Sequence, residues 1–220
     1  MGSAVDTGEK RISEDNIRVL TIGHSSMSID DFLTVLRQTG VTAVADVRTS
    51  PFSRRLPHFS RDELRAALSE NNIRYVFLGQ ELGGRPKDRR LYCDGVADYG
   101  RMALEPAFLE GLDRVIKGAR AHTIALMCSE QNPLDCHRCL LVARALTKRD
   151  ISVGHIVEDG RIVDQPGIEE KLLDLTDYNF DDLFASRGER LDMAYKSRAR
   201  KVAFQERDLD SETHKLTSEN

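Results

Sequence analysis

The segment 128–138 carries the residue types that most often do chemistry in proteins. A thiol beside cationic groups can ionise and act as a nucleophile, and a carboxylate can move protons. The backbone N–H groups at the start of a helix bind anions. From these properties we predict catalytic roles for two residues, Cys128 and Glu130, and substrate binding by three more, Cys136, His137 and Arg138.

The same segment allows plainer interpretations. Cys128 could be a small core residue, and Asp135 is expected to cap the following helix. Cys128, Cys136, His137 and Cys139 resemble a list of zinc ligands. However, we expect 136 and 139 to lie in a helix, whereas structural zinc usually takes its paired ligands from a turn. The sequence therefore predicts no cofactor, with zinc as the less favoured alternative.

Further polar residues follow two other apolar runs. His24 and Ser25 come directly after the first run, where the histidine could act as a general base or orient a phosphate. A turn histidine that caps the backbone is the plain alternative. Asp46 and Arg48 stand at the end of the second run. Arg48 could hold a phosphate, while Asp46 could accept a hydrogen bond from the ligand or anchor the arginine. We predict a catalytic role for His24 and substrate binding by Ser25, Asp46 and Arg48.

Residues 48–90 are basic in a chain that is acidic as a whole. The chain has 32 Lys and Arg against 36 Asp and Glu, a net charge of −4, yet this stretch carries +5 and the remainder −9. Arginine forks near aromatic rings suit phosphate binding and base stacking, although a solvated basic face is the ordinary alternative. The substrate-binding residues that we predict in this stretch, besides Arg48, are Ser53, Arg54, Arg55, Gly83, Gly84 and Arg85.

The elements that must position these residues alternate between strand and helix. Apolar runs predict strands at 18–23, 42–47, 73–78, 123–128 and 151–157, and helices at 28–38, 60–71, 105–121 and 136–149. Ser28 is expected to cap the first helix, and Ser60 with Glu63 to form a capping box on the second. The long segment 79–90 reads as a functional loop. The pattern predicts an α/β fold: an open, mostly parallel sheet of about five strands with helices on both faces. Ligands of such sheets bind beyond the carboxyl ends of the strands.

The length of 220 residues suits one such domain with extensions. We expect a disordered segment at 1–16, an α/β core at 17–165, a helical extension at 166–200 and a disordered tail at 201–220. The charged extension offers a surface for a protein partner. The N-terminal residues lack an apolar signal core, and no apolar run approaches the ~20 residues of a membrane helix. We therefore expect a cytoplasmic protein without membrane contact.

Several motifs in combination resemble the family of bacterial and archaeal domains of unknown function numbered 488 (DUF488). They are TIGHS at 21–25, DVR at 46–48 with Pro51 and Ser53, LGG at 82–84, CSE-x2-P-x2-CHR at 128–138, and His155-Ile156. The resemblance covers about residues 18–160 and implies an α/β fold without a particular activity. A weaker similarity to rhodaneses and cysteine phosphatases breaks down at the cysteine loop. Nine residues without a glycine separate Cys128 from Arg138, which argues against a tight backbone cradle.

The polar diversity of these loops favours an enzyme over a plain binding protein. We predict a hydrolase or group transferase acting on a nucleotide, a nucleic acid or another phosphorylated anionic substrate. Redox chemistry with a dinucleotide is disfavoured because no glycine fingerprint follows the first strand. Two alternatives remain open. One is a non-catalytic nucleic-acid or nucleotide-binding module, and the other is a thiol-based sulfur-transfer or redox protein centred on Cys128 and Cys136.

Overall fold

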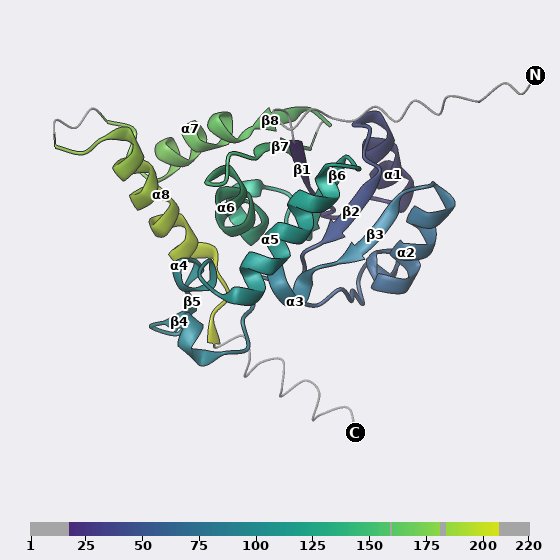
Figure 1. The fold of residues 1–220 in the computed structure, drawn as a ribbon, viewed down its shortest axis with the longest axis horizontal. Coiled ribbons are helices and arrows are strands. Elements are labelled where there is room, and N and C mark those ends of the chain that lie inside the picture. The colour runs from purple at the N-terminus through teal and green to yellow at the C-terminus, as the bar shows by residue number, and fades with distance from the viewer. Residues whose placement is uncertain (1–17, 159, 181–183, 207–220) are drawn as a thin grey trace, which may run out of the picture.

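The computed structural model describes residues 18–158, 160–180 and 184–206 (Figure 1). We expected disorder at 1–16 and 201–220. Residues 1–16 and most of 201–220 lie outside the described ranges. One six-stranded sheet, in the order β3-β2-β6-β1-β7-β8, forms the centre of the fold. The strands are β1 (Arg18–Gly23), β2 (Ala43–Asp46), β3 (Arg74–Phe77), β6 (Ile124–Cys128), β7 (Ser152–Ile156) and β8 (Ile162–Asp164).

Five of these strands are parallel, as the sequence predicted, and β8 is added at the edge, antiparallel to β7. The three-residue β8 was not foreseen, because so short a run shows no periodicity of its own. The α/β class with a mostly parallel sheet is confirmed.

Helices cover both faces of the sheet (Figure 1). On one face, α1 (Ile29–Gln38) and α2 (Arg61–Glu70) pack through residues such as Phe32, Leu36 and Leu64. On the other face, the elements are α5 (Pro106–Ala119), the continuous helix made of η5 (Arg138–Ala143) and α6 (Arg144–Thr147), α7 (Gln165–Leu175) and α8 (Arg187–Val202). Alternate residues of β1 face opposite sides of the sheet. Leu20 belongs to the hydrophobic core on the side of α1 and α2, and Val19 belongs to the core on the other side.

The segment between β3 and α5 folds into several short elements instead of the long loop expected at 79–90. They are α3 (Gly79–Leu82), η3 (Arg89–Leu91), the antiparallel hairpin of β4 (Tyr92–Cys93) and β5 (Val96–Ala97), and α4 (Tyr99–Met102). Two further 3-10 turns, η2 (Pro57–Phe59) and η4 (Pro133–Asp135), lie in the loops after β2 and β6. Each of these elements is only two to four residues long, which is too short for a sequence pattern to reveal.

Of the three predicted caps, only one forms. Ser28 Oγ accepts a hydrogen bond from the Asp31 N–H, as expected. Ser60 stands at the start of α2, but its hydroxyl does not cap the helix; it accepts instead from the Ser53 N–H at 3.2 Å. The prediction for Asp135 was also wrong, because its carboxylate bonds to Asn132 at 3.0 Å and pairs with Arg198 of α8.

The helical extension belongs to the same hydrophobic core as the sheet. Leu172 of α7 and Tyr195 of α8 are fully buried in it. A buried polar chain joins the two helices to the strands. Thr21 donates to His155 Nδ1 (2.9 Å), His155 Nε2 donates to Gln165 (2.6 Å), and Gln165 donates to the Tyr195 hydroxyl (2.5 Å). Two helices, α7 and α8, thus occupy most of the segment 166–200, and they complete one side of the core.

Among the described residues, no helix is both long enough and apolar enough to cross a bilayer.

Candidate functional site

The carboxyl ends of β2, β6 and β1, three neighbouring strands, form the edge where the candidate residues meet. The connection after β1 leads toward β2 and β3, whereas the connection after β6 leads the other way, to β7. Ligands of open α/β sheets bind where connections diverge in this manner. Backbone hydrogen bonds fix the loops to one another, from His24 N to Cys128 O (2.9 Å) and from Val47 N to Met127 O (3.1 Å).

Four residues at the end of β6 and in the segment that follows it form one compact group, which we name the thiol cluster: Cys128, Glu130, Cys136 and His137. Their ligand atoms all lie within 4.8 Å of one another. The Cys128 thiol donates to Glu130 Oε2 at 3.0 Å, and His137 Nδ1 lies 3.8 Å from Cys128 Sγ and 3.9 Å from Cys136 Sγ. Both cysteines and the histidine are buried, while Glu130 is exposed. The loop therefore presents two sulfurs, one nitrogen and one carboxylate at a single point.

The orientation of His137 is fixed by the loop after β2. Its Nε2 donates to the Val47 carbonyl at 2.9 Å, so Nδ1 is the nitrogen that faces the two sulfurs. Gly84 lies directly against the ring, because a Cβ there would come 2.7 Å from His137 Cγ. The segment 83–85 thus touches the thiol cluster. The sequence had predicted Gly84 only as one of several substrate-binding residues.

The two thiols differ sharply in acidity. Burial opposes ionisation of Cys136, but the hydrogen bond from Cys128 and the charges of Arg138 and His137 outweigh it and hold the pKa well below its usual value. For Cys128, burial, the hydrogen bond with Cys136 and its charge, and the charge of Glu130 all raise the pKa well above its usual value. Sequence reasoning placed the reactive thiol at Cys128. In the structure, Arg138 and His137 lie beside Cys136, so the surroundings of Cys136 favour a thiolate more than those of Cys128 do.

Arg138 is fully buried and holds the loop together. Its guanidinium donates to the Gln131 carbonyl at 2.7 Å and also to the Glu130 carbonyl, and its backbone N–H points to Cys136 Sγ at 3.4 Å. Nε has no hydrogen-bond partner among the described residues. Burial would lower the pKa of Arg138, but the negative charge of Cys136 raises it. This placement makes Arg138 a support of the loop rather than a direct contact for substrate.

A second polar group surrounds Arg48. Asp46 accepts from Arg48 Nε at 2.9 Å and from Nη2 at 2.6 Å, and the Tyr75 hydroxyl donates to the same carboxylate at 2.8 Å. Arg48 Nη1 donates to His24 Nε2 at 3.3 Å. These contacts occupy three of the five guanidinium N–H groups. Tyr75 was not among the predicted residues, although the pairing of β3 with β2 places it within reach of Asp46.

His24 is held as a neutral ring. Nδ1 donates to the Ser25 carbonyl at 3.0 Å, and the ring stacks on Phe59 with 4.1 Å between centroids. Burial, followed by the charge of Arg48, lowers the pKa of His24 to about 4. Both ring nitrogens are engaged, so His24 positions Arg48. Ser25 lies beside it, with its hydroxyl 3.4 Å from Gln131 Oε1.

A cleft of about 850 Å³ opens next to the thiol cluster, between the loop after β2 and the segment after β3. Gly83 and Arg85 line it, together with Arg61, whose guanidinium lies 3.9 Å above the Phe77 ring. The Arg85 N–H donates to Thr49 Oγ1 at 3.1 Å. Arg61 and Phe77 were not predicted as site residues, although Arg61 belongs to the basic run that was singled out.

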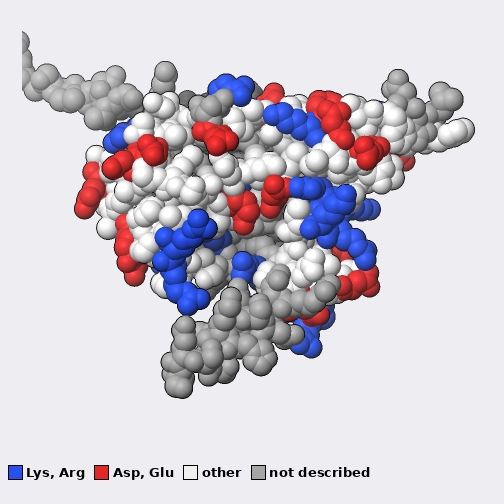
Figure 2. Space-filling model, turned by 180° about the vertical axis from the view of Figure 1, so that it is seen from behind, with Lys and Arg blue, Asp and Glu red and all other residues white. Residues whose placement is uncertain are grey.

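Ser53, Arg54 and Arg55, which we predicted to bind substrate, belong neither to this cleft nor to the thiol cluster. Ser53 closes its own turn, accepting from the Leu56 N–H at 3.0 Å, and Arg54 and Arg55 are exposed beyond it. On the face shown in Figure 2, Lys and Arg side chains form separate groups divided by acidic and uncharged surface. The Lys and Arg side chains on that face thus form no single continuous basic surface.

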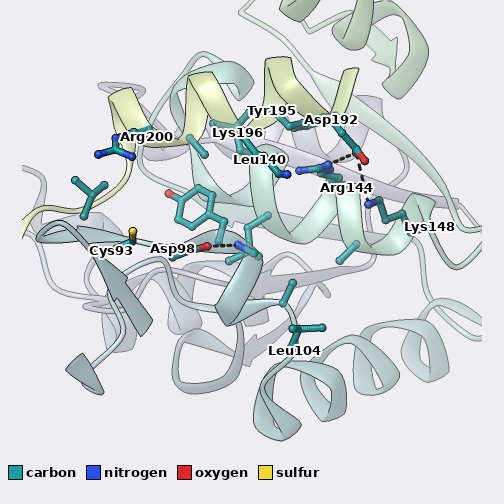
Figure 3. Close-up of a pocket in the computed structure, with 18 of the residues that line it drawn as sticks. Cys93, Asp98, Leu104, Leu140, Arg144, Lys148, Asp192, Tyr195, Lys196 and Arg200 are labelled. Carbon is teal, nitrogen blue, oxygen red and sulfur yellow. Dashed lines mark hydrogen bonds and ion pairs between the residues drawn. The ribbon is translucent and has the colours of Figure 1, made fainter. Parts of the chain in front are cut away.

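Another hollow, of about 680 Å³, lies between α4, α8 and the helix 138–147 (Figure 3). Leu104 and Leu140 give it an apolar lining, and Asp192 pairs there with Arg144 and Lys148. Because these three side chains pair with each other, they are less available to bind a charged ligand. We therefore consider the cleft beside the thiol cluster the better candidate site.

The family model described as "Domain of unknown function DUF488" matches residues 28–145. That range includes β2, the cleft and all four residues of the thiol cluster. Comparison with curated proteins and with solved structures gives no match.

Proposed function

The chain belongs to the DUF488 family of domains of unknown function, and from the geometry of its site we propose that it is an enzyme, a hydrolase or group transferase, that acts on a small phosphorylated substrate. One observation carries the proposal. The segment 83–85 separates two halves of a site: Gly83 and Arg85 line the cleft, and Gly84 touches His137 of the thiol cluster. No residue of the thiol cluster lines the cleft itself, so we place the reacting end of an anionic group bound there toward Gly84, which lies against His137 of the cluster.

The cleft suits a substrate of nucleotide size. Its volume falls within the range of about 300–1,000 Å³ typical of small-molecule sites. Arg61, Arg85 and Lys87 supply positive charge, and Phe77 supplies an aromatic ring. Five acidic side chains line it too, those of Asp62, Glu63, Glu81, Asp88 and Glu105. Glu81 pairs with Arg114 and Asp88 with Arg90, which reduces the repulsion of an anion by these two. A guanidinium held over a ring is well placed to contact both a phosphate and a base.

The edge of the sheet supplies the chemistry. Glu130 is exposed and lies 3.0 Å from Cys128 Sγ, so it can exchange a proton with the bound substrate or with water. Arg48, fixed by Asp46 and His24, keeps two N–H groups for negative charge that develops during reaction. We place this enzyme in the cytoplasm, where reduced thiols such as Cys128 and Cys136 persist.

A substrate screen tests the proposal. The purified chain is incubated with nucleoside mono-, di- and triphosphates, other phosphomonoesters, phosphodiesters and short oligonucleotides, and release or transfer of a group is measured. We expect turnover of one of these classes, at least about 100-fold lower in Glu130→Gln and with a raised KM in Arg61→Met. Arg65→Met, an exposed arginine of α2 outside the cleft, is the matched control.

The alternative of a binding module gives the opposite result. Salt-sensitive binding of oligonucleotides without turnover of any class would overturn the enzymatic proposal and favour a nucleic-acid-binding protein.

A further inference from the structure

We propose that the thiol cluster is a metal site that holds one thiophilic divalent ion of the zinc class. This inference names the cofactor of the proposed active site. Binding of the ion rests on the geometry of the cluster alone, and only its catalytic use rests on the proposed function.

The donor set is the first argument. Two thiols, an imidazole and a carboxylate are the ligands that Zn²⁺ takes in proteins. Bond lengths of about 2.0–2.3 Å in a tetrahedron place neighbouring ligand atoms about 3.3–3.8 Å apart. In the structure, His137 Nδ1 lies 3.8 Å from Cys128 Sγ and 3.9 Å from Cys136 Sγ, and Glu130 Oε2 lies 3.0 Å from Cys128 Sγ. Small rotations of the side chains bring all four atoms onto one ion.

The surroundings of the ligands are those of a prepared metal site. A ligating histidine usually donates its other ring nitrogen to a carbonyl or carboxylate, which fixes the ring. His137 does this through Nε2 and the Val47 carbonyl at 2.9 Å. Cys136 Sγ already faces the Arg138 backbone N–H, and the Arg138 side chain holds the loop carbonyls of 130 and 131. The ligands are therefore positioned both by Val47 in the loop after β2 and by Arg138.

Charge supports the same conclusion. Metal binding requires both thiols and the carboxylate in their deprotonated forms, which brings three negative charges to the site. A divalent ion and the buried Arg138 guanidinium together neutralise them. The orphan Nε of Arg138 and its complete burial show that this cation needs a negative partner inside the protein.

The burial of the ligands indicates where the ion meets solvent. Cys128, Cys136 and His137 are buried, and Glu130 is the one exposed member of the cluster. Catalytic zinc sites hold three protein ligands firmly and leave the fourth position for water or substrate. Exchange at the Glu130 position would give the ion that access.

The sequence argument disfavoured zinc because Cys136 and Cys139 were both expected to lie in a helix, whereas in the structure Cys136 lies just before the helix. In the structure, Cys139 is fully buried in the hydrophobic core, where burial raises its pKa to about 12. Glu130 completes the group instead. A carboxylate two residues after a strand-end cysteine is not part of the common Cys-x-x-Cys spacing. For this reason the zinc ligands considered from the sequence did not include Glu130.

Metal titration of the reduced full-length chain tests the proposal. The protein is stripped with a chelator, kept in a phosphine reductant, and titrated with Zn²⁺ or Co²⁺. We expect one equivalent to bind, a rise in Tm with Zn²⁺, and, with Co²⁺, thiolate-to-metal charge-transfer bands together with the strong visible bands of tetrahedral cobalt. The reactivity of two thiols toward an aromatic disulfide reagent should fall on metal addition.

Variants assign the ligands. Cys136→Ser and His137→Gln should lose the cobalt bands, while Cys139→Ser and Cys93→Ser should keep them with unchanged stoichiometry. Thermal unfolding of each apo variant shows whether it is folded. Wild-type protein that binds no stoichiometric metal, or whose bands survive Cys136→Ser, would overturn the site. Because binding is read without substrate, stoichiometric metal with no turnover in the screen would overturn the proposed activity and leave the metal site standing.

Discussion

Arg198 of α8 holds Asp135 in the loop that carries the thiol cluster. Its Nη2 pairs with the Asp135 carboxylate and its Nε donates to the Leu134 carbonyl at 3.0 Å. The residue that directly follows Asp135 is Cys136. The C-terminal helix is thus tied to the candidate active site, 63 residues earlier in the chain.

The first prediction follows from this contact. Arg198→Met should lower the free energy of unfolding by about 1–2 kcal/mol, the usual value of a charged hydrogen bond that is partly shielded from water. It should also weaken cobalt binding, because the loop before Cys136 loses its outer support. Urea unfolding and metal titration measure the two effects. Arg200→Met, which breaks the exposed pair with Asp94, should cost less than about 0.5 kcal/mol and leave the metal affinity unchanged.

The second prediction concerns Gly84. A methyl group there meets the His137 ring at 2.7 Å, so Gly84→Ala must displace either the loop or the ring. We expect a loss of about 1–3 kcal/mol in unfolding free energy together with impaired turnover. Gly188→Ala is the matched control, since its nearest contact would be 3.9 Å away. Equal behaviour of the two variants would show that 84 is not packed against the cluster.

The third prediction concerns the buried ion pair of Arg48. Asp46→Asn leaves the guanidinium without its counter-charge in the core, and should cost about 3 kcal/mol or more. Tyr75→Phe removes one hydrogen bond to the same carboxylate and should cost only about 1 kcal/mol. Chemical denaturation of both variants and of the wild type measures the two losses in unfolding free energy. A smaller loss for Asp46→Asn than for Tyr75→Phe would contradict the role given to Asp46.

The fourth prediction is a pH dependence of stability. Burial lowers the pKa of His155 from about 6.5 to about 4, so the ring stays neutral in the folded state while it becomes protonated in the unfolded state. Its contribution to stability is therefore complete above pH ~6.5 and is lost as the pH falls toward 4. Between pH 7 and pH 5 the wild type should lose about 2 kcal/mol more than His155→Gln. Urea melts at the two pH values measure this difference, and identical pH slopes would refute it.

The architecture was largely predictable from the sequence. The parallel strands read as continuous apolar runs because both faces of the sheet are covered, as for residues 124–128 of β6. Ser28 was a correct cap because its partner, Asp31, is three residues away. These features depend on neighbours in the sequence.

The errors concern residues whose partners are distant. Asp135 pairs with Arg198 instead of capping a helix, and Ser60 bonds to the turn at Ser53. The location of the candidate site at the carboxyl edge followed from the strand order, but the identity of its acidic thiol did not. Both thiols are buried, and their pKa values shift in opposite directions because Arg138 and His137 lie near Cys136 whereas Glu130 lies near Cys128. The spacing of residues along the sequence does not reveal these neighbours.

The strand order also fixes when the site can form during synthesis. β6 lies between β1 and β2, so the first two strands have no direct pairing with each other. Until residues 124–128 leave the ribosome, β1 has neither of its two neighbours, and β2 and β3 can make only an isolated parallel pair. The sheet closes over long sequence separations, which slows folding. Cys128 is the last residue of β6, so the strand that joins β1 to β2 also delivers the first thiol to the cluster.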